Sequence, residues 1–188
     1  MILQPGELLQ QRYEIIGQVG QGGFGTVYRA IDRRMFNYFV AVKVSTPELP
    51  PALTQSDQAR LQSRLEVARR QFEAEARLLS ALHHPRLPRV TDYFIDPERG
   101  QFMVMDFIEG DSLADLLAQR GEPLPEGEAV YYAREVGGAL SDLHGRTPPI
   151  FHRDVKPANV ILTESHQIYL VDFGIAKVDL VGGGHSRT

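Results

Sequence analysis

Two short stretches decide the fold of this chain: HRDVKPAN at residues 152–159 and DFG at residues 172–174. They place two carboxylates (Asp154, Asp172), an amide (Asn159) and a lysine (Lys156) on loops separated by a short apolar segment. Such groups can hold Mg²⁺ and a polyphosphate and can accept the proton of a hydroxyl. Each residue alone is as easily explained as a turn former or a helix cap, but the joint spacing argues against that explanation.

A glycine-rich stretch, GQGGFGTV, lies upstream at residues 20–27. Glycine lets backbone N–H groups approach a phosphate closely, although an isolated match of this kind is equally typical of a flexible hairpin tip. A dinucleotide-binding turn needs a helix after the glycines and an acidic residue about 20 positions further on. Here a strand-like run follows, at residues 26–31, and position 45 is Ser45, so the dinucleotide interpretation fails.

The apolar run at residues 38–44 predicts a strand that contains Val40-Ala41-Val42-Lys43. Strand alternation places Ala41 and Lys43 on one face, and Val40 and Val42 on the other. A lysine flanked by apolar residues on a central strand is costly to bury without an anion. The alternative is a lysine exposed to water on an edge strand.

The remaining periodicity predicts a β-rich half followed by a helix-rich half, with the break near residues 107–110. A long helix is expected from residue 56 or 57 to residue 82, capped by Thr54 or Ser56. Its apolar stripe comprises Leu61, Leu65, Ala68, Phe72, Ala76 and Leu79. The other expected elements are strands at 13–16, 89–95, 101–106, 160–163 and 168–171, and helices at 112–119 and 126–144, the last with Ala129, Tyr132, Val136, Leu140 and Leu143 on one face.

Composition excludes several classes of function. The 188 residues are 43% hydrophobic, which is enough for a packed core, and a net charge of −4 with scattered basic residues argues against a nucleic-acid partner. There is no cysteine, which rules out disulfides and fits a reducing cytoplasm. No apolar run approaches the roughly 18 residues of a membrane span, and the N-terminus does not resemble a signal peptide, so we expect a cytoplasmic protein.

Together these motifs resemble the eukaryotic-type (bacterial-style) serine/threonine protein kinases. The resemblance implies an α+β, two-lobed protein-kinase-like fold. Residues 1–107 would form a β-rich N-lobe with one long helix, and residues 108–188 an incomplete helical C-lobe with the catalytic loop and DFG. It further implies a non-specific serine/threonine protein kinase that uses ATP and Mg²⁺ and phosphorylates Ser/Thr hydroxyls of protein substrates.

The same resemblance assigns roles to the charged residues. Asp154 would accept the proton of the substrate hydroxyl, and Lys156 would neutralise the transferring phosphoryl group. Lys43 would bind the phosphates and pair with a helix glutamate, for which Glu75 fits best because it lies beside the apolar stripe. Asn159 and Asp172 would be the Mg²⁺ ligands. His152 is expected to pack near Phe173, and Arg153 to pair with a phosphate on Ser186 or Thr188.

A nucleotide site is implied as well. Val27, Ala41 and Ile161 would form apolar walls around the adenine, with Met105 behind them, and plain core packing explains these residues almost equally well. Ser112 is a candidate for the ribose, and Leu79, Val90, His152 and Phe173 for a packed stack. The expected nucleotide-binding residues are Gly20, Gly22, Gly23, Phe24, Gly25, Val27, Ala41, Lys43, Met105, Asp106, Ile108 and Ile161, with the backbone of 106–108 bonding the adenine edge.

The chain ends at Thr188, without the A-P-E motif and further helices of the family. We therefore expect a C-terminally truncated kinase domain whose incomplete C-lobe needs a partner or a missing C-terminal region as a cover. Two alternatives stay open. One is a non-catalytic nucleotide-binding or regulatory kinase-like module, and the other is a small-molecule kinase of related fold.

Overall fold

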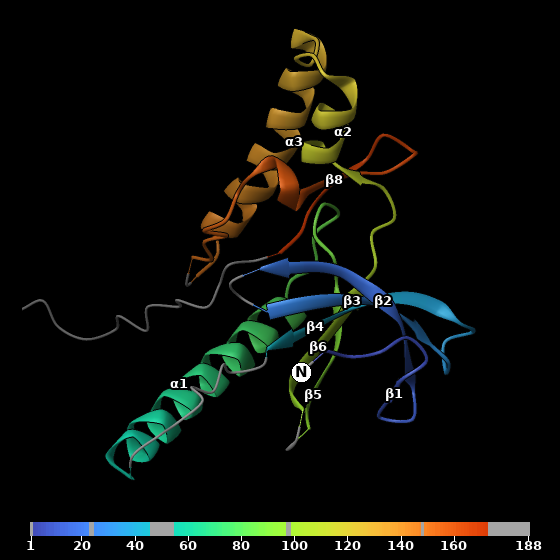
Figure 1. The fold of residues 1–188 in the computed structure, drawn as a ribbon. Helices are drawn as coiled ribbons and strands as arrows, with labels where there is room; N and C mark the ends of the chain where they lie inside the picture. Colours follow the sequence, from blue (N-terminus) through green and yellow to red (C-terminus); the bar gives the residue numbers. More distant parts are fainter. Residues whose placement is uncertain (1, 23–24, 46–54, 97–98, 148, 173–188) are drawn as a thin grey trace, which may run out of the picture.

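A computed structural model describes residues 2–22, 25–45, 55–96, 99–147 and 149–172, without some side chains in the first part of the long helix and that of Glu75 (Figure 1). Two sheets organise this part of the chain. The larger has six antiparallel strands in the order β1-β2-β3-β4-β6-β5, and the smaller has three in the order β7-β8-β9. The six strands are β1 (Leu8–Leu9), β2 (Tyr13–Gly22), β3 (Gly25–Asp32), β4 (Tyr38–Ser45), β5 (Val90–Asp96) and β6 (Gly100–Asp106).

Strand β4 lies inside the larger sheet, between β3 and β6, and is buried along most of its length. The alternation predicted for it is confirmed. Val40 and Val42 belong to the core on one face of the sheet, together with Tyr13, Ile15 and Phe102. Ala41 and Lys43 line a cleft on the other face. Lys43 is therefore an interior residue and not an exposed edge-strand lysine.

The long helix α1 (Gln55–Ser80) packs against β5 and β6. The second half of its predicted stripe is confirmed, since Phe72, Ala76 and Leu79 are buried in one cluster. Ser56 lies inside the helix, so its prediction as the cap is wrong, and Thr54 lies outside the described residues. The side chains of Leu61, Leu65 and Ala68 also lie outside the described part of the chain.

The second half of the chain contains helices around the small sheet. Ser112 caps its first helix, because its hydroxyl accepts a hydrogen bond from the Asp115 N–H at 3.0 Å. In the next helix, Tyr132 and Leu143 are buried as expected, but Ala129 is exposed, because the packed part of the helix begins at Tyr132. The elements are β7 (Asp111–Ser112), α2 (Leu113–Arg120), α3 (Glu126–His144), the 3-10 helix η1 (Pro157–Asn159), β8 (Val160–Leu162) and β9 (Ile168–Leu170).

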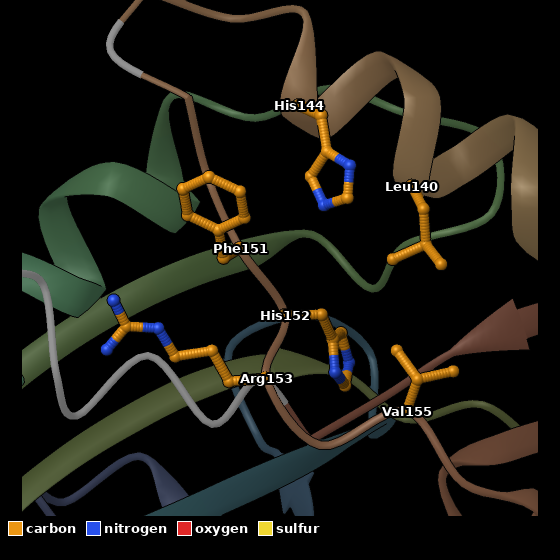
Figure 2. A pocket seen from close by; sticks show the side chains of 6 residues that line it. All are labelled: Leu140, His144, Phe151, His152, Arg153 and Val155. Carbon is orange, nitrogen blue, oxygen red and sulfur yellow. The ribbon is translucent and has the colours of Figure 1, made fainter.

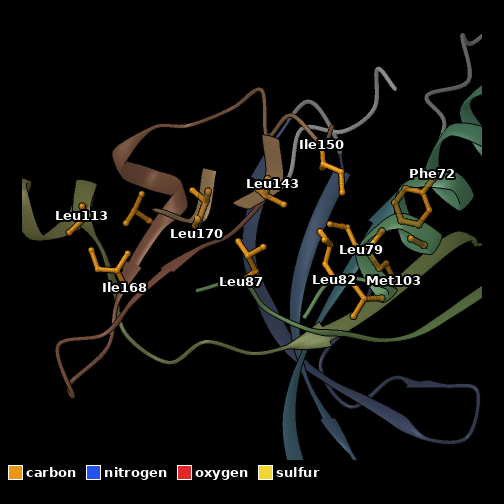
Figure 3. Packing of buried hydrophobic residues seen from close by; sticks show 14 of the residues in the cluster. Phe72, Leu79, Leu82, Leu87, Met103, Leu113, Leu143, Ile150, Ile168 and Leu170 are labelled. Carbon is orange, nitrogen blue, oxygen red and sulfur yellow. The ribbon is translucent and has the colours of Figure 1, made fainter. Parts of the chain in front are cut away.

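One apolar cluster joins the two halves (Figure 3). It contains Phe72 and Leu79 of α1, Leu87 of the following loop, and Leu143 and Leu170 of the second half. Polar contacts reinforce this junction. The His84 Nε2 lies 3.0 Å from Asp142 of α3, and Arg86 pairs with Glu135. The two lobes therefore pack together through the segment that follows α1, which fixes the two walls of the cleft relative to each other.

The described helices also bear on membrane insertion. None of them is both long enough and apolar enough to cross a bilayer.

Candidate active site

A cleft of about 690 Å³ lies between the large sheet and the loops around β8 and β9. It brings together residues that are far apart in the sequence, from the glycine-rich stretch, from β4 and β6, and from both loop motifs. The predicted site residues that line it are Gly20, Gly25, Val27, Ala41, Lys43, Met105, Asp106, Ile108, Asp154, Lys156, Asn159, Ile161 and Asp172.

The other predicted site residues are placed differently. Gly22 ends β2 and pairs with Gly25. Gly23 and Phe24 lie outside the described residues, as do Phe173, Ser186, Thr188 and the Glu75 side chain. The Lys43–Glu75 pair, the packing of Phe173 and the phosphorylation of Ser186 or Thr188 therefore stay predictions.

The β2–β3 hairpin covers one end of the cleft, and two of its glycines have different roles. Gly25 has φ +128°, and a Cβ there would lie 2.2 Å from the Val44 carbonyl oxygen, so no other residue fits without a shift of β4. A Cβ on Gly20 would meet no atom of the described residues within 4 Å. The space beside Gly20 is thus open on the cleft, as a phosphate-binding backbone requires.

Lys43 of β4 is the positively charged side chain of the upper wall, which is the side of the cleft formed by the large sheet. Its side chain is only 4% exposed, although it opens on the cleft. A buried ammonium group is stable only beside anionic or strongly polar groups. The position therefore suits contact with a polyphosphate that enters the cleft.

The segment that begins with Asp106 at the end of β6 and ends at Gly110 forms the connection between the lobes. Asp106 fixes its start twice, because the Asp106 N–H donates to the Arg89 carbonyl and the Asp106 Oδ2 accepts from the Arg89 N–H, both at 3.0 Å. Met105, Val27, Ala41 and Ile161 contribute apolar surface to the adjoining cleft. A flat apolar ring can lie between such walls with its polar edge against the backbone of the connection.

Asp154 lies in a network of short polar contacts on the lower wall, which is the side of the cleft formed by the loops around β8 and β9. Its Oδ2 accepts from the Lys156 Nζ at 2.7 Å and from the Asn159 Nδ2 at 2.9 Å, and Asn159 also donates to the Asp154 backbone carbonyl at 2.8 Å. The hydrogen bond from Lys156 holds the pKa of the Asp154 carboxyl below its usual value. Asp154 is therefore ionised at neutral pH, and its Oδ1 takes part in neither of these side-chain bonds.

His152 holds the two loops together. It is 1% exposed, and its Nε2–H donates to the Val171 carbonyl at 3.0 Å, while the Val171 N–H donates to the Asn159 carbonyl at 2.9 Å. Burial lowers the pKa of the His152 imidazole, which favours the neutral ring. The predicted structural role of His152 agrees with these contacts.

The loops depend on unusual backbone geometry. Arg153 and Asp172 adopt left-handed conformations, with φ of +62° and +56°. Non-glycine residues rarely do so, and such positions concentrate at functional sites. Arg153 directly follows His152 and Asp172 directly follows Val171, so both left-handed residues lie next to the hydrogen bond that joins the two loops.

Asn159 and Asp172 fit a hard dication. The bonds described above use the Asn159 amide nitrogen, so they do not involve its oxygen, and Asp172 supplies a carboxylate on the same cleft. Among the described residues, no three or more His, Asp or Glu side chains are placed to hold a metal by themselves. Mg²⁺ suits this donor set because it keeps several waters and shares its ligands with bound phosphates.

A second, apolar hollow of about 400 Å³ lies at the end of α3, beside the catalytic loop (Figure 2). The centroids of the His144 and Phe151 rings lie 5.1 Å apart, with the ring planes tilted by 44°. Leu140, His152, Arg153 and Val155 complete its lining. None of these lining residues is a carboxylate, so the candidate chemistry belongs to the main cleft.

Some cleft residues were not predicted from the sequence. Val19 lines the cleft, as does Asp115, whose Oδ2 accepts from the Ser112 hydroxyl at 2.6 Å. This bond makes Asp115 a second candidate, beside Ser112, for a polar contact with a ligand. The i, i+3 spacing of Ser112 and Asp115 at a helix start is the signal that would have paired them.

Comparison with known proteins agrees with this geometry. The protein kinase domain model matches residues 13–179. A "Probable serine/threonine-protein kinase" of Clostridium perfringens is 35% identical over 172 residues, which cover 92% of this chain and 22% of the relative. The chain thus spans about a fifth of that protein's length.

Two solved structures have a similar fold. The apo form of PpkA-294 gives a TM-score of 0.74 at 28% identity, covering 93% of this chain and 62% of its own. A crystal structure of Rad53 in complex with AMP-PNP gives 0.68 at 28% identity, covering 87% of this chain and 38% of its own. The chain therefore belongs to the protein kinase domain family, has the two-lobed kinase fold, and is of the bacterial serine/threonine type.

Proposed function

We propose that this chain transfers the terminal phosphoryl group of ATP to Ser or Thr hydroxyls of protein substrates. The observation that carries the proposal is the convergence of Lys43, Asp154, Lys156, Asn159 and Asp172 on one cleft, from two lobes. The kinase names of its bacterial relatives support the acceptor class, and the complex of Rad53 with AMP-PNP supports a purine triphosphate as donor.

The lower wall supplies the groups for acceptor chemistry. Asp154 is ionised at neutral pH, so its carboxylate can orient a hydroxyl and accept its proton as the new P–O bond forms. Lys156, bonded to the same carboxylate, places a positive charge where negative charge develops on the phosphoryl group. His152 holds this loop in place and stays neutral.

The remaining groups hold the donor. Lys43 would bind the phosphates from the upper wall, and Glu75 would orient Lys43. Asn159 and Asp172 would hold Mg²⁺, which neutralises phosphate charge when bound. The apolar walls and the backbone of residues 106–108 would hold the adenine, and the open space beside Gly20 would admit the phosphates.

We also propose the finer assignments that accompany this function. The lobes divide between residues 107 and 108, a partner or further chain covers the apolar hollow at the end of α3, and the protein works in the cytoplasm. The apolar lining of that hollow and the absence of cysteine from the chain support the last two assignments.

Asp154→Asn tests the proposal, because it removes the proton acceptor and keeps the shape of the side chain. Labelled phosphate transfer from ATP to a Ser/Thr-containing acceptor protein should fall by at least about a hundredfold. Binding of Mg·ATP, followed by calorimetry, should stay within severalfold of the unaltered chain. Binding of Mg·ATP by the unaltered chain without any transfer would favour the non-catalytic module instead.

A further inference from the structure

The connection between the lobes is held by a side chain that does not line the cleft. Arg29 of β3 stands directly opposite Ala41 of β4, and residues opposite each other in an antiparallel pair point to the same face. Ala41 lines the cleft, and Phe39, two residues before it, shares that face. Arg29 and Phe39 therefore extend the cleft face of the sheet toward the connection.

The Arg29 guanidinium packs against two aromatic rings. Its Cζ is 3.9 Å from the centroid of Phe39 and 4.9 Å from that of Phe107, and Phe107 belongs to the connection and lines the cleft. Cations are attracted to aromatic faces at these distances, and a planar guanidinium can use both of its sides at once. Arg29 thus joins the sheet to the connection through stacked groups.

Two polar observations agree with this arrangement. The Arg29 Nη2 lies 3.4 Å from the Glu109 carboxylate, two residues beyond Phe107. The Arg29 Nε is buried and, within the described part of the chain, makes no hydrogen bond. This nitrogen is therefore shielded from water, which agrees with close packing of the guanidinium.

The connection is also fixed at both ends. Asp106 is bonded to the Arg89 backbone at its start. At its end, Gly110 has φ +154°, and a Cβ there would lie 2.2 Å from the Leu162 carbonyl oxygen. Between these points, the Arg29 contacts are side-chain contacts that tie residues 107 and 109 to the upper lobe.

We propose that Arg29 is a positioning residue that fixes residues 107–109 against the upper-lobe sheet and so presets the adenine edge of the cleft. The inference rests on the proposed nucleotide site, because presetting matters only if the backbone of 106–108 meets a base. Fixing a binding segment in its bound form raises affinity by lowering the ordering cost of binding. The effect of Arg29 should therefore fall on ATP affinity and KM, and not on the phosphoryl transfer step.

The test uses Arg29→Leu, which keeps bulk but removes the charge and the planar group. Arg29→Lys keeps the charge and loses the planar stacking. The control is Arg33→Leu, because Arg33 is an exposed arginine that, like Arg29, pairs with a glutamate, here Glu14 at 2.9 Å. Phe39→Leu removes one stacking partner from the sheet side and serves if Arg29→Leu does not give folded protein.

Hydrogen exchange of the 107–110 amides, without nucleotide, is the first measurement. We expect faster exchange in Arg29→Leu and unchanged exchange there in Arg33→Leu. The second measurement is ATP affinity by calorimetry, which should weaken roughly three- to tenfold in Arg29→Leu, with partial recovery in Arg29→Lys and kcat at saturating ATP unchanged.

Unchanged exchange in Arg29→Leu would overturn the inference, and so would equal effects in Arg33→Leu, which indicate a general loss of stability. Failure of the unaltered chain to bind ATP would count against the proposed function instead. The exchange measurement then decides on its own whether Arg29 fixes the connection.

Discussion

The two walls of the cleft are built by different means. The upper wall is a regular sheet, in which the register of β3 and β4 places Val27, Ala41 and Lys43 on one face. The lower wall consists of loops held by specific side-chain bonds, with left-handed backbone at Arg153 and Asp172. The residues of the upper wall are therefore positioned by the pairing of the strand backbones, whereas the residues of the lower wall are positioned by bonds among their own side chains.

The largest expected effect uses one residue from each wall. Lys43→Met removes the proposed phosphate-binding cation and Asp172→Asn removes the charge of the proposed Mg²⁺ ligand, and each should lower phosphate transfer by more than about a thousandfold. Glu164→Gln, an exposed carboxylate on the turn between β8 and β9, is the matched control and should have no effect. Circular dichroism should show that all three variants fold. Transfer that persists in Lys43→Met or Asp172→Asn would contradict the assignment.

A glycine pair tests how rigidly the upper wall is specified. Gly25→Ala forces a left-handed alanine whose Cβ would lie 2.2 Å from the Val44 oxygen, and it should lower the free energy of unfolding by about 2–4 kcal/mol. The added methyl of Gly20→Ala would meet no atom within 4 Å in the part of the chain that the structure describes, and this change should cost less than about 1 kcal/mol. Urea denaturation measures both. Equal losses of stability would contradict this prediction, because the different space around Gly20 and Gly25 would then have no effect.

The upper lobe also contains an acid-sensitive pair outside the cleft. The hydrogen bond from Arg12 lowers the pKa of the buried Asp32 carboxyl, and Arg12 reaches Asp92 as well. A lowered folded-state pKa stabilises the protein above the unfolded pKa of about 3.9, and this stability is lost as the pH falls through the folded value.

Asp32→Asn should therefore cost about 1–3 kcal/mol at pH 7, and the cost should shrink steadily below pH 4. Urea midpoints at several pH values measure this. A cost that is independent of pH would mean that the charge of Asp32 contributes nothing.

The lower wall should respond to acid at a higher pH. Burial lowers the folded-state pKa of His152, so as the pH falls below about 6.5 the unfolded chain takes up the proton first and stability decreases. His152→Leu should remove this slope below about pH 6.5 and leave the Asp32 window unchanged. Thermal midpoints across that range measure the effect, and a slope that survives in His152→Leu would assign it to another group.

The contrast between the regular sheet of the upper wall and the loops of the lower wall explains what could be predicted from the sequence. Alternation located Lys43 and Ala41, and periodicity located α3, because regular elements repeat their contacts. Val19 was missed because β2 contains register irregularities at Ile15/Gly17 and Gln18/Gly20, and a bulge changes the face to which later residues point. Strands of two residues, such as β1 and β7, are too short to show any period.

The lower wall was predictable only through its resemblance to a family. No periodicity places Asp154 beside Asn159 and Lys156, and nothing in Arg153 or Asp172 as residue types indicates a left-handed backbone. Ser56 and Ala129 show the limits of local rules. The first is a good cap residue that lies within a helix, and the second is an apolar residue one turn before the packed part of α3 begins.

Titration calorimetry of the unaltered chain with ATP, with and without Mg²⁺, asks whether both walls of the cleft converge on a magnesium-bound nucleotide. We expect a heat of binding that strengthens with Mg²⁺, and we expect Asp172→Asn to remove this strengthening while Glu164→Gln keeps it. Folded protein that shows no heat would contradict such a cleft, and so would an Asp172→Asn variant that responds to Mg²⁺ as the unaltered chain does.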